Sequence, residues 1–75
     1  MKDLALFIVK ALADWPDKVS VSESEQGQTT LLRLSVAEED KGKIIGKQGK
    51  VIKAIRSLIL ASAAKQGKKV TLDIE

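Results

Sequence analysis

Residues 44–52 read Ile44-Ile45-Gly46-Lys47-Gln48-Gly49-Lys50-Val51-Ile52, so that two glycines bracket two polar residues and apolar residues flank both sides. This pattern predicts a helix that ends near Ile45, a tight bend, and a second helix that begins at once. Glycine permits such a reversal, and its missing Cβ lets the backbone of a ligand come close. The first N–H groups of the second helix lack partners within it and carry a partial positive charge, which suits a phosphate. Lys47 and Gln48 would add a charge and a hydrogen-bond donor, although a plain helix–helix turn would also need the two glycines.

The bend lies in the basic part of the chain. Four nearby cations could meet the same ligand: Lys43, Lys50, Lys53 and Arg56. The net charge of +3 is divided unevenly, since residues 1–40 hold four bases and eight acids, whereas residues 41–75 hold nine bases and two acids. This asymmetry favours a basic face that meets a polyanion, while a solvated lysine-rich surface would have the same composition.

Upstream of the bend, the sequence predicts one helix and a pair of strands. Residues 3–14 contain no Gly or Pro, and we expect a helix with Asp3 as its N-cap that ends before Pro16. Residues 18–24 and 29–36 alternate between apolar and polar, as strands with one buried face do. Their inward positions are Val19, Val21, Leu32, Leu34 and Val36. The polar connection at 25–28 has hairpin length and predicts an antiparallel pair.

The rest of the chain predicts two helices and a third strand. Residues 37–45 start with acids and end with bases, which suits a short helix, and residues 50–65 form a longer one that stops at Gly67. Residues 70–74 alternate again, and two intervening helices allow this strand to lie parallel to the second one. We therefore expect one domain, residues 1–75, with an α+β two-layer sandwich of order α-β-β-α-α-β, in which three helices cover one face of a three-stranded mixed sheet.

Two helices carry more apolar surface than such a sheet can cover. The first has apolar residues around most of its circumference, leaving one narrow polar stripe. On the longer helix the expected inward set is Val51, Ile52, Ile55, Leu58, Ile59 and Ala63. Leu60 falls on the opposite, polar side, so we expect a protein partner at the first helix or at Leu60.

Composition excludes several classes of site. The chain has no cysteine and no histidine, which removes thiol chemistry, the commonest general base and the commonest transition-metal ligand. We therefore expect no enzyme, no cofactor and no metal site, and we assign the acids Glu38, Glu39 and Asp40 to an exposed helix start. The N-terminal apolar run is too short for a secretion signal or a membrane span, so a cytoplasmic protein with no membrane contact is expected. A P-loop is excluded because Gln48 stands where Ser or Thr would bind magnesium.

Residues 44–52 resemble the central signature of KH domains, V/I-I-G-x-x-G-x-x-I, at every specified position. The expected order of helices and strands is that of the type II arrangement, and the length resembles the small stand-alone bacterial KH proteins of the KhpA family. The resemblance implies binding of single-stranded RNA, with a backbone clamp formed by Gly46, Lys47, Gln48 and Gly49. Ile45 and the start of the following helix would border the bases.

The remaining candidates rest on position and charge: Lys43, Lys50, Lys53 and Arg56 are expected to contact further phosphates. The resemblance also implies a role as an RNA chaperone or post-transcriptional regulator. It suggests a homodimer, or a heterodimer with another KH-containing protein. Two alternatives stay open: single-stranded DNA as the ligand, and a protein-interaction module built on the first helix.

Overall fold

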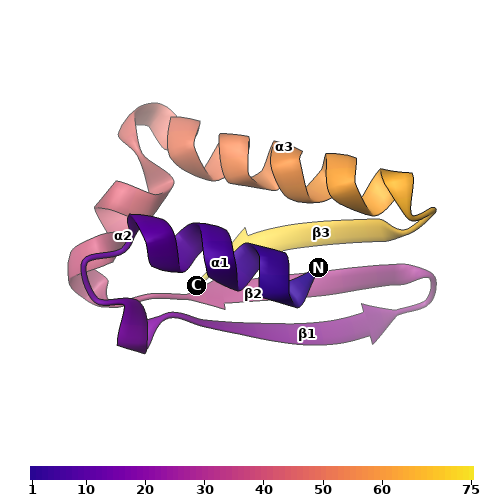
Figure 1. Cartoon of the computed structure of the whole chain (residues 1–75), viewed down its shortest axis with the longest axis horizontal. Helices are drawn as coiled ribbons and strands as arrows, with labels where there is room; N and C mark the ends of the chain where they lie inside the picture. The colour runs from indigo at the N-terminus through magenta and orange to yellow at the C-terminus, as the bar shows by residue number, and fades with distance from the viewer.

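The computed structural model describes residues 1–75. Its helices, strands and two 3-10 turns follow in this order: α1 (Lys2–Leu12), η1 (Pro16–Lys18), β1 (Ser20–Gln26), β2 (Thr29–Ser35), α2 (Glu38–Ile45), η2 (Lys47–Gly49), α3 (Lys50–Lys65) and β3 (Lys69–Ile74) (Figure 1). The predicted α-β-β-α-α-β order is confirmed. None of these helices combines the length and the apolar character needed to cross a bilayer.

The three strands form one mixed sheet in the order β1-β2-β3. β1 and β2 are antiparallel with Val21 opposite Leu34, and β2 and β3 are parallel with Leu32 opposite Leu72. Both pairings agree with the sequence-based prediction. Side chains from the apolar positions of all three strands therefore share one face of the sheet.

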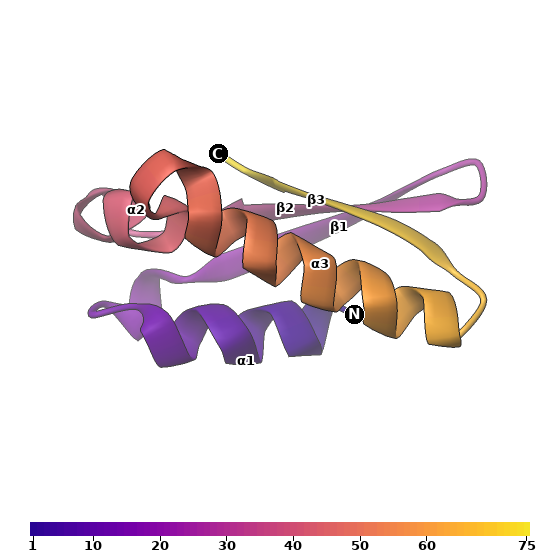
Figure 2. The same ribbon diagram turned by 90° about the horizontal axis from the view of Figure 1, so that it is seen from above.

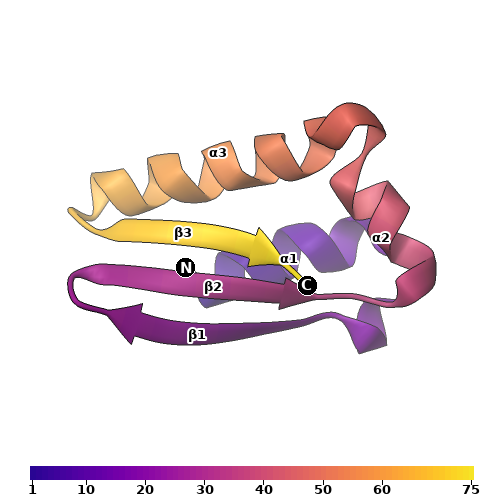
Figure 3. The ribbon, with the colours of Figure 1, turned by 180° about the vertical axis from the view of Figure 1, so that it is seen from behind.

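The helices lie on that apolar face and give the expected two-layer sandwich. Figure 2 shows α1 and α3 side by side on one side of the sheet, with α2 beyond the ends of the strands. Figure 3 shows the opposite face of the sheet, which no helix covers. Several core side chains are fully buried between the layers, among them Val9, Leu32, Leu34, Ile44, Ile59 and Leu72.

The bounds of α1 differ from the prediction at both ends. The helix begins at Lys2 with Met1 as N-cap, and Asp3 lies within the first turn without a capping hydrogen bond. After Leu12 the Ala13 N–H still donates to the Val9 carbonyl at 2.9 Å, but the N–H groups of Asp14 and Trp15 donate to the Asp40 carboxylate at 3.1 and 3.0 Å, so the helix does not continue.

Asp40 is consequently not part of an exposed helix start, as the sequence suggested. Its side chain is only 1% exposed, whereas its neighbours Glu38 and Glu39 are exposed. Burial of a carboxylate is costly unless hydrogen bonds satisfy it, and here two backbone donors do so. Asp40 thereby fixes the first turn of α2 to the chain segment that follows α1.

The first strand also runs later than predicted, from Ser20 to Gln26, and the turn shrinks to two residues, Gly27 and Gln28. Gly27 adopts a φ of 66°, as the first residue of a tight hairpin turn often does. The strand extends past its apolar part because Gln26 still pairs with Thr29. Backbone pairing does not require apolar side chains, so alternation alone set the boundary too early.

Some apolar side chains of the two long helices remain in solvent. Leu58 was expected to face the core but is 58% exposed, because the buried side of α3 is limited to Ile52, Ile55, Ile59 and Ala63. Leu60 is exposed as predicted, and on α1 the Phe7 side chain is 73% exposed. The surplus of apolar surface predicted from the sequence is therefore present in the fold.

Candidate nucleic-acid interface

The Gly46–Gly49 segment forms an exposed loop at one corner of the molecule. α2 ends at Ile45, the η2 turn follows, and α3 begins at Lys50 (Figure 1). Backbone hydrogen bonds close the loop on both sides: Gly46 donates to the carbonyl of Gly42 at 2.8 Å, and Gly49 donates to that of Gly46 at 3.1 Å. The predicted helix–bend–helix arrangement is confirmed, and the loop is held in a defined shape by its own backbone.

Gly46 is required by both conformation and packing. Its φ of 78° and ψ of 169° lie in a region that is essentially restricted to glycine. A Cβ at this position would also lie 2.8 Å from the Cβ atom of Val51, closer than two carbon atoms can approach. Gly46 therefore lets the first turn of α3 fold back against the end of α2.

Gly49 differs from Gly46, although the sequence gives both the same expected role. Its φ of 75° and ψ of 16° are left-handed helical. A Cβ there would meet only the Cε atom of Lys53 at 3.9 Å and a methyl group of Ile52 at 4.0 Å. A side chain at Gly49 would thus make only ordinary van der Waals contacts, so packing does not require glycine at this position.

Gln48 has an unexpected backbone conformation. Its φ of 58° makes it the one non-glycine residue with a positive φ in the chain. Such a conformation costs about 1–2 kcal/mol for a residue with a side chain. The sequence predicts a hydrogen-bond donor at Gln48 but gives no signal of this strain, because glutamine is not a residue type that favours a positive φ.

The N-terminus of α3 has no protein group that neutralises it. Its N-cap is Gly49, no side chain caps it, and its first turn contains no acid but does contain Lys50. α2 shows the opposite pattern, with three acids in its first turn. Cations at the positive end of a helix are unfavourable, so the start of α3 is an electropositive point suited to an anion.

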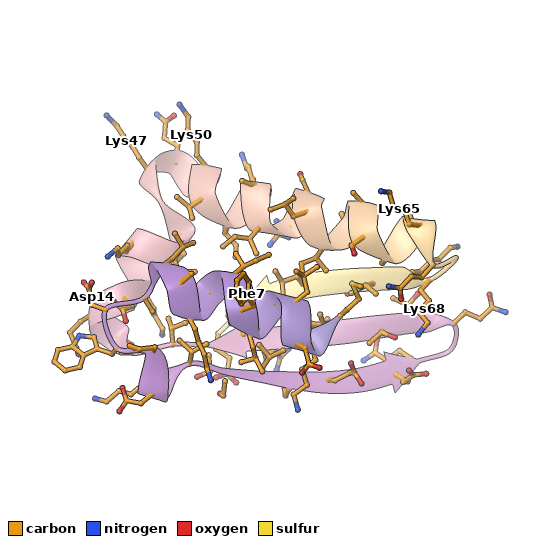
Figure 4. The ribbon with its side chains drawn as sticks, in the orientation of Figure 1. Phe7, Asp14, Lys47, Lys50, Lys65 and Lys68 are labelled. Atoms are coloured by element: carbon orange, nitrogen blue, oxygen red, sulfur yellow. The ribbon has the colours of Figure 1, made fainter.

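Three predicted lysines extend this positive surface. Lys47, Lys50 and Lys53 are all exposed, and none of them forms an ion pair with an acid. In Figure 4 the Lys47 and Lys50 side chains point away from the body of the protein at the loop. The structure therefore brings these three cations together at the loop and the first turn of α3.

The other two predicted cations are already engaged. The ammonium of Lys43 lies 3.0 Å from a carboxylate oxygen of Asp14, and Arg56 donates from Nε to the carbonyl of Leu72 at 3.0 Å. Arg56 thus connects α3 to β3, and Lys43 has a partner that the sequence did not predict. Asp14 lies 29 residues away in the chain, so no local pattern could have indicated the pair.

Apolar residues anchor the loop to the core. Ile44 and Ile52 are buried, while Ile45 is half-buried and packs against the core cluster from the end of α2. The surface holds no pocket. The candidate site is consequently an exposed loop and helix terminus with an apolar flank at Ile45.

Comparisons with known proteins identify the family of the chain. The family described as "KhpA/KhpB, KH domain" matches residues 2–74. The chain is 51% identical over 74 residues to the RNA-binding protein KhpA of Clostridium acetobutylicum, covering 99% of both chains. It is 50% identical over 74 residues to the RNA-binding protein KhpA of Halalkalibacterium halodurans, covering 99% of this chain and 97% of that one.

Among solved structures, the fold is similar to part of Era from Aquifex aeolicus bound to GDP and aluminium fluoride, with a TM-score of 0.69 and 20% identity. The match covers 97% of this chain and 28% of Era. A second Era structure, in complex with a GTP analogue and nucleotides 1506–1542 of 16S ribosomal RNA, matches with the same TM-score and coverage. At this identity the likeness concerns the fold alone. The full-length family match and the relatives at about half identity establish that the chain belongs to the KhpA/KhpB family of KH-domain proteins.

Proposed function

We propose that the protein binds single-stranded RNA by holding its sugar–phosphate backbone against the Gly46–Gly49 loop. One observation carries the proposal: the uncapped N-terminus of α3 lies directly beneath this loop and is surrounded by lysines that have no acidic partner. A negatively charged ligand would satisfy the helix end and the lysines together. The relatives that share about half of the sequence are named RNA-binding proteins.

In the proposed complex the loop glycines have separate tasks. Gly46 fixes the bend, because Val51 occupies the space that a side chain would need. Gly49 leaves room for the ligand backbone, since no atom lies closer than 3.9 Å to the position that a Cβ would occupy. Lys47 and Lys50 then pair with phosphates, and the Gln48 amide donates a hydrogen bond.

The bases would pass Ile45 and the first turn of α3. Ile45 is half-buried and offers an apolar edge, whereas the chain has no exposed aromatic residue at the loop on which bases could stack. We therefore expect weak base selectivity and contacts dominated by the backbone. This behaviour suits an RNA chaperone or a post-transcriptional regulator that acts on many transcripts in the cytoplasm.

The test places negative charge where phosphate is expected to bind. In Lys47→Asp with Gln48→Asp, binding of a single-stranded RNA of about five nucleotides should fall below detection by fluorescence anisotropy. Aspartate tolerates left-handed backbone, so the fold should survive and can be checked by circular dichroism. The matched control, Lys18→Asp with Gln28→Asp, makes the same change in charge at two exposed positions away from the loop. Unchanged binding in the loop variant, or an equal loss in the control, would contradict the loop as the binding site.

A second proposed activity is self-association. Phe7 of α1 and Leu58 and Leu60 of α3 are exposed, and a chain of this size gains stability by covering such residues with a partner. We propose a second copy of the chain as that partner. Sedimentation velocity should show concentration-dependent dimers that Phe7→Ser or Leu60→Ser weakens. A monomer at all concentrations would contradict self-association, and another KH-containing protein would then be the candidate partner to mix with it.

A further inference from the structure

We propose that Lys65, Lys68 and Lys69 form a second phosphate-binding cluster, the distal cluster, so that a long RNA contacts the protein from the loop to the turn between α3 and β3. This inference rests on the proposed RNA-binding function and extends it beyond the few nucleotides that the loop can hold. These three lysines form no ion pair within the chain, and an RNA phosphate would give them a partner.

The distal cluster is exposed and held by a well-defined turn. α3 ends at Lys65, Gly67 adopts a φ of 69°, and the N–H groups of Gly67 and Lys68 donate to the carbonyls of Ala64 and Ala63 at 3.0 and 2.9 Å. This pair of hydrogen bonds is the Schellman arrangement that commonly closes a helix. The three lysines therefore project from a fixed backbone, and none forms an ion pair.

The distal cluster and the loop lie at opposite ends of the same helix. Figure 4 shows Lys65 and Lys68 at one end of α3 and Lys47 and Lys50 at the other. Between them the exposed side chains of α3 include Lys53 and carry no negative charge. Only two acids follow Asp40 in the chain, and both lie at the end of β3: Asp73 and Glu75. This strand runs back toward the loop end of the molecule, and Asp73 pairs with Arg33 in the sheet register. A polyanion that lies along α3 thus meets positive charge at both ends and no acid of this helix on the way.

The length of α3 sets the size of RNA that can reach both sites. Sixteen residues give a helix of roughly 24 Å, and a stacked strand carries one phosphate per about 3.4 Å. About seven nucleotides therefore separate the loop from the distal cluster. An RNA of about five nucleotides would contact one site, whereas one of about fifteen would contact both.

The experiment compares these two RNA lengths, as oligoadenosine, whose bases stack, with three proteins: the wild type, Lys65→Gln with Lys68→Gln, and the control Lys10→Gln with Lys18→Gln. The control removes the same charge, and Lys10 occupies the last turn of α1 as Lys65 does that of α3, so the two variants lose similar helix-dipole contributions. Affinity is measured by anisotropy over a series of salt concentrations. The slope of log affinity against log salt is the decisive quantity, because a longer RNA gains binding registers that raise affinity without changing the slope.

We expect the wild type to show a steeper slope with the long RNA than with the short one, by about 1.4 for two further phosphates. The Lys65→Gln, Lys68→Gln protein should lose this difference and bind the long RNA on the order of tenfold more weakly at low salt, with short-RNA binding nearly unchanged. The control should keep the difference. Equal slopes for both lengths in the wild type, or equal losses in both variants, would overturn the distal cluster while leaving the loop site intact. Absence of short-RNA binding by the wild type would instead contradict the proposed function itself.

Discussion

A β-carbon added to Gly46 would lie 2.8 Å from both the Cβ and the backbone nitrogen of Val51, so the bend before α3 depends on the absence of a side chain at this position. The second glycine of the loop has no such neighbour: the nearest atom to a Cβ on Gly49 would be 3.9 Å away. The two glycines of the motif are therefore unequal. One determines the fold of the loop, and the other leaves its outer surface open.

Alanine at the two positions should separate these tasks. Gly46→Ala combines a glycine-only backbone conformation with a clash, and should lower the free energy of unfolding by about 3 kcal/mol or more. In Gly49→Ala the alanine must adopt the left-handed conformation but makes no clash, so the free energy of unfolding should fall by about 1 kcal/mol. Urea denaturation followed by circular dichroism measures both. Similar stabilities of the two variants would show that Val51 does not limit the loop.

Asp40 should matter for stability far more than the acids beside it. Asp40→Ala leaves two backbone N–H groups, those of Asp14 and Trp15, without their acceptor, and should lower the free energy of unfolding by about 2–4 kcal/mol. Glu39→Ala removes an acid from the same helical turn, where it is exposed. Glu39→Ala loses a similar interaction with the helix dipole, so the difference between the two variants reports the hydrogen bonds of Asp40. Glu39→Ala should change the free energy of unfolding by less than about 0.5 kcal/mol. The prediction would be wrong if the two substitutions had equal effects in thermal or urea denaturation.

These examples show where the sequence predicts the structure well. Alternation, helical periodicity and the charge pattern of residues 37–45 predicted the three α-helices and the three strands, and the glycine pattern at Gly46–Gly49 predicted the loop, because such features depend on neighbours within a few residues. Gly67 likewise marked the end of α3 through a local conformational need. The fold class follows from these local features, since the order of elements allows few ways to cover one apolar sheet face.

Most side-chain contacts that the sequence did not predict involve distant partners. Asp40 resembles any acid at a helix start until the amides of Asp14 and Trp15, 26 and 25 residues away, are brought to it. Leu58 lies at the edge of the apolar side of α3, and only the actual packing of that helix decides that it is exposed. The engagement of Arg56 with the Leu72 carbonyl requires the final position of the β3 edge. Tertiary contacts of this kind leave no periodic signal in the chain.

The salt dependence of short-RNA binding should report a contact made mainly with phosphates. With three to four phosphates neutralised at the loop, log affinity for a five-nucleotide RNA should fall against log salt with a slope of about −2 to −3. A DNA strand of the same sequence should give a similar slope, because phosphate contacts do not read the 2′-hydroxyl. Anisotropy titrations at several salt concentrations test both statements. An affinity independent of salt would rule out the lysines as the main source of binding.

Lys43 and Asp14 provide the last prediction. Their side chains lie 3.0 Å apart and are both well exposed, so in the proposed complex the carboxylate would compete with an RNA phosphate for the Lys43 ammonium. Exposed pairs are worth only about 0–1 kcal/mol, and a phosphate could displace one at small cost. Asp14→Asn keeps the backbone N–H that Asp40 accepts but removes this competition, and should raise RNA affinity about two- to fivefold at low salt. Asp17→Asn makes the same change in charge at an exposed position that forms no ion pair with Lys43, and it should have a smaller effect. If both substitutions raise the affinity equally, the gain comes from net charge alone and Lys43 is not a phosphate contact.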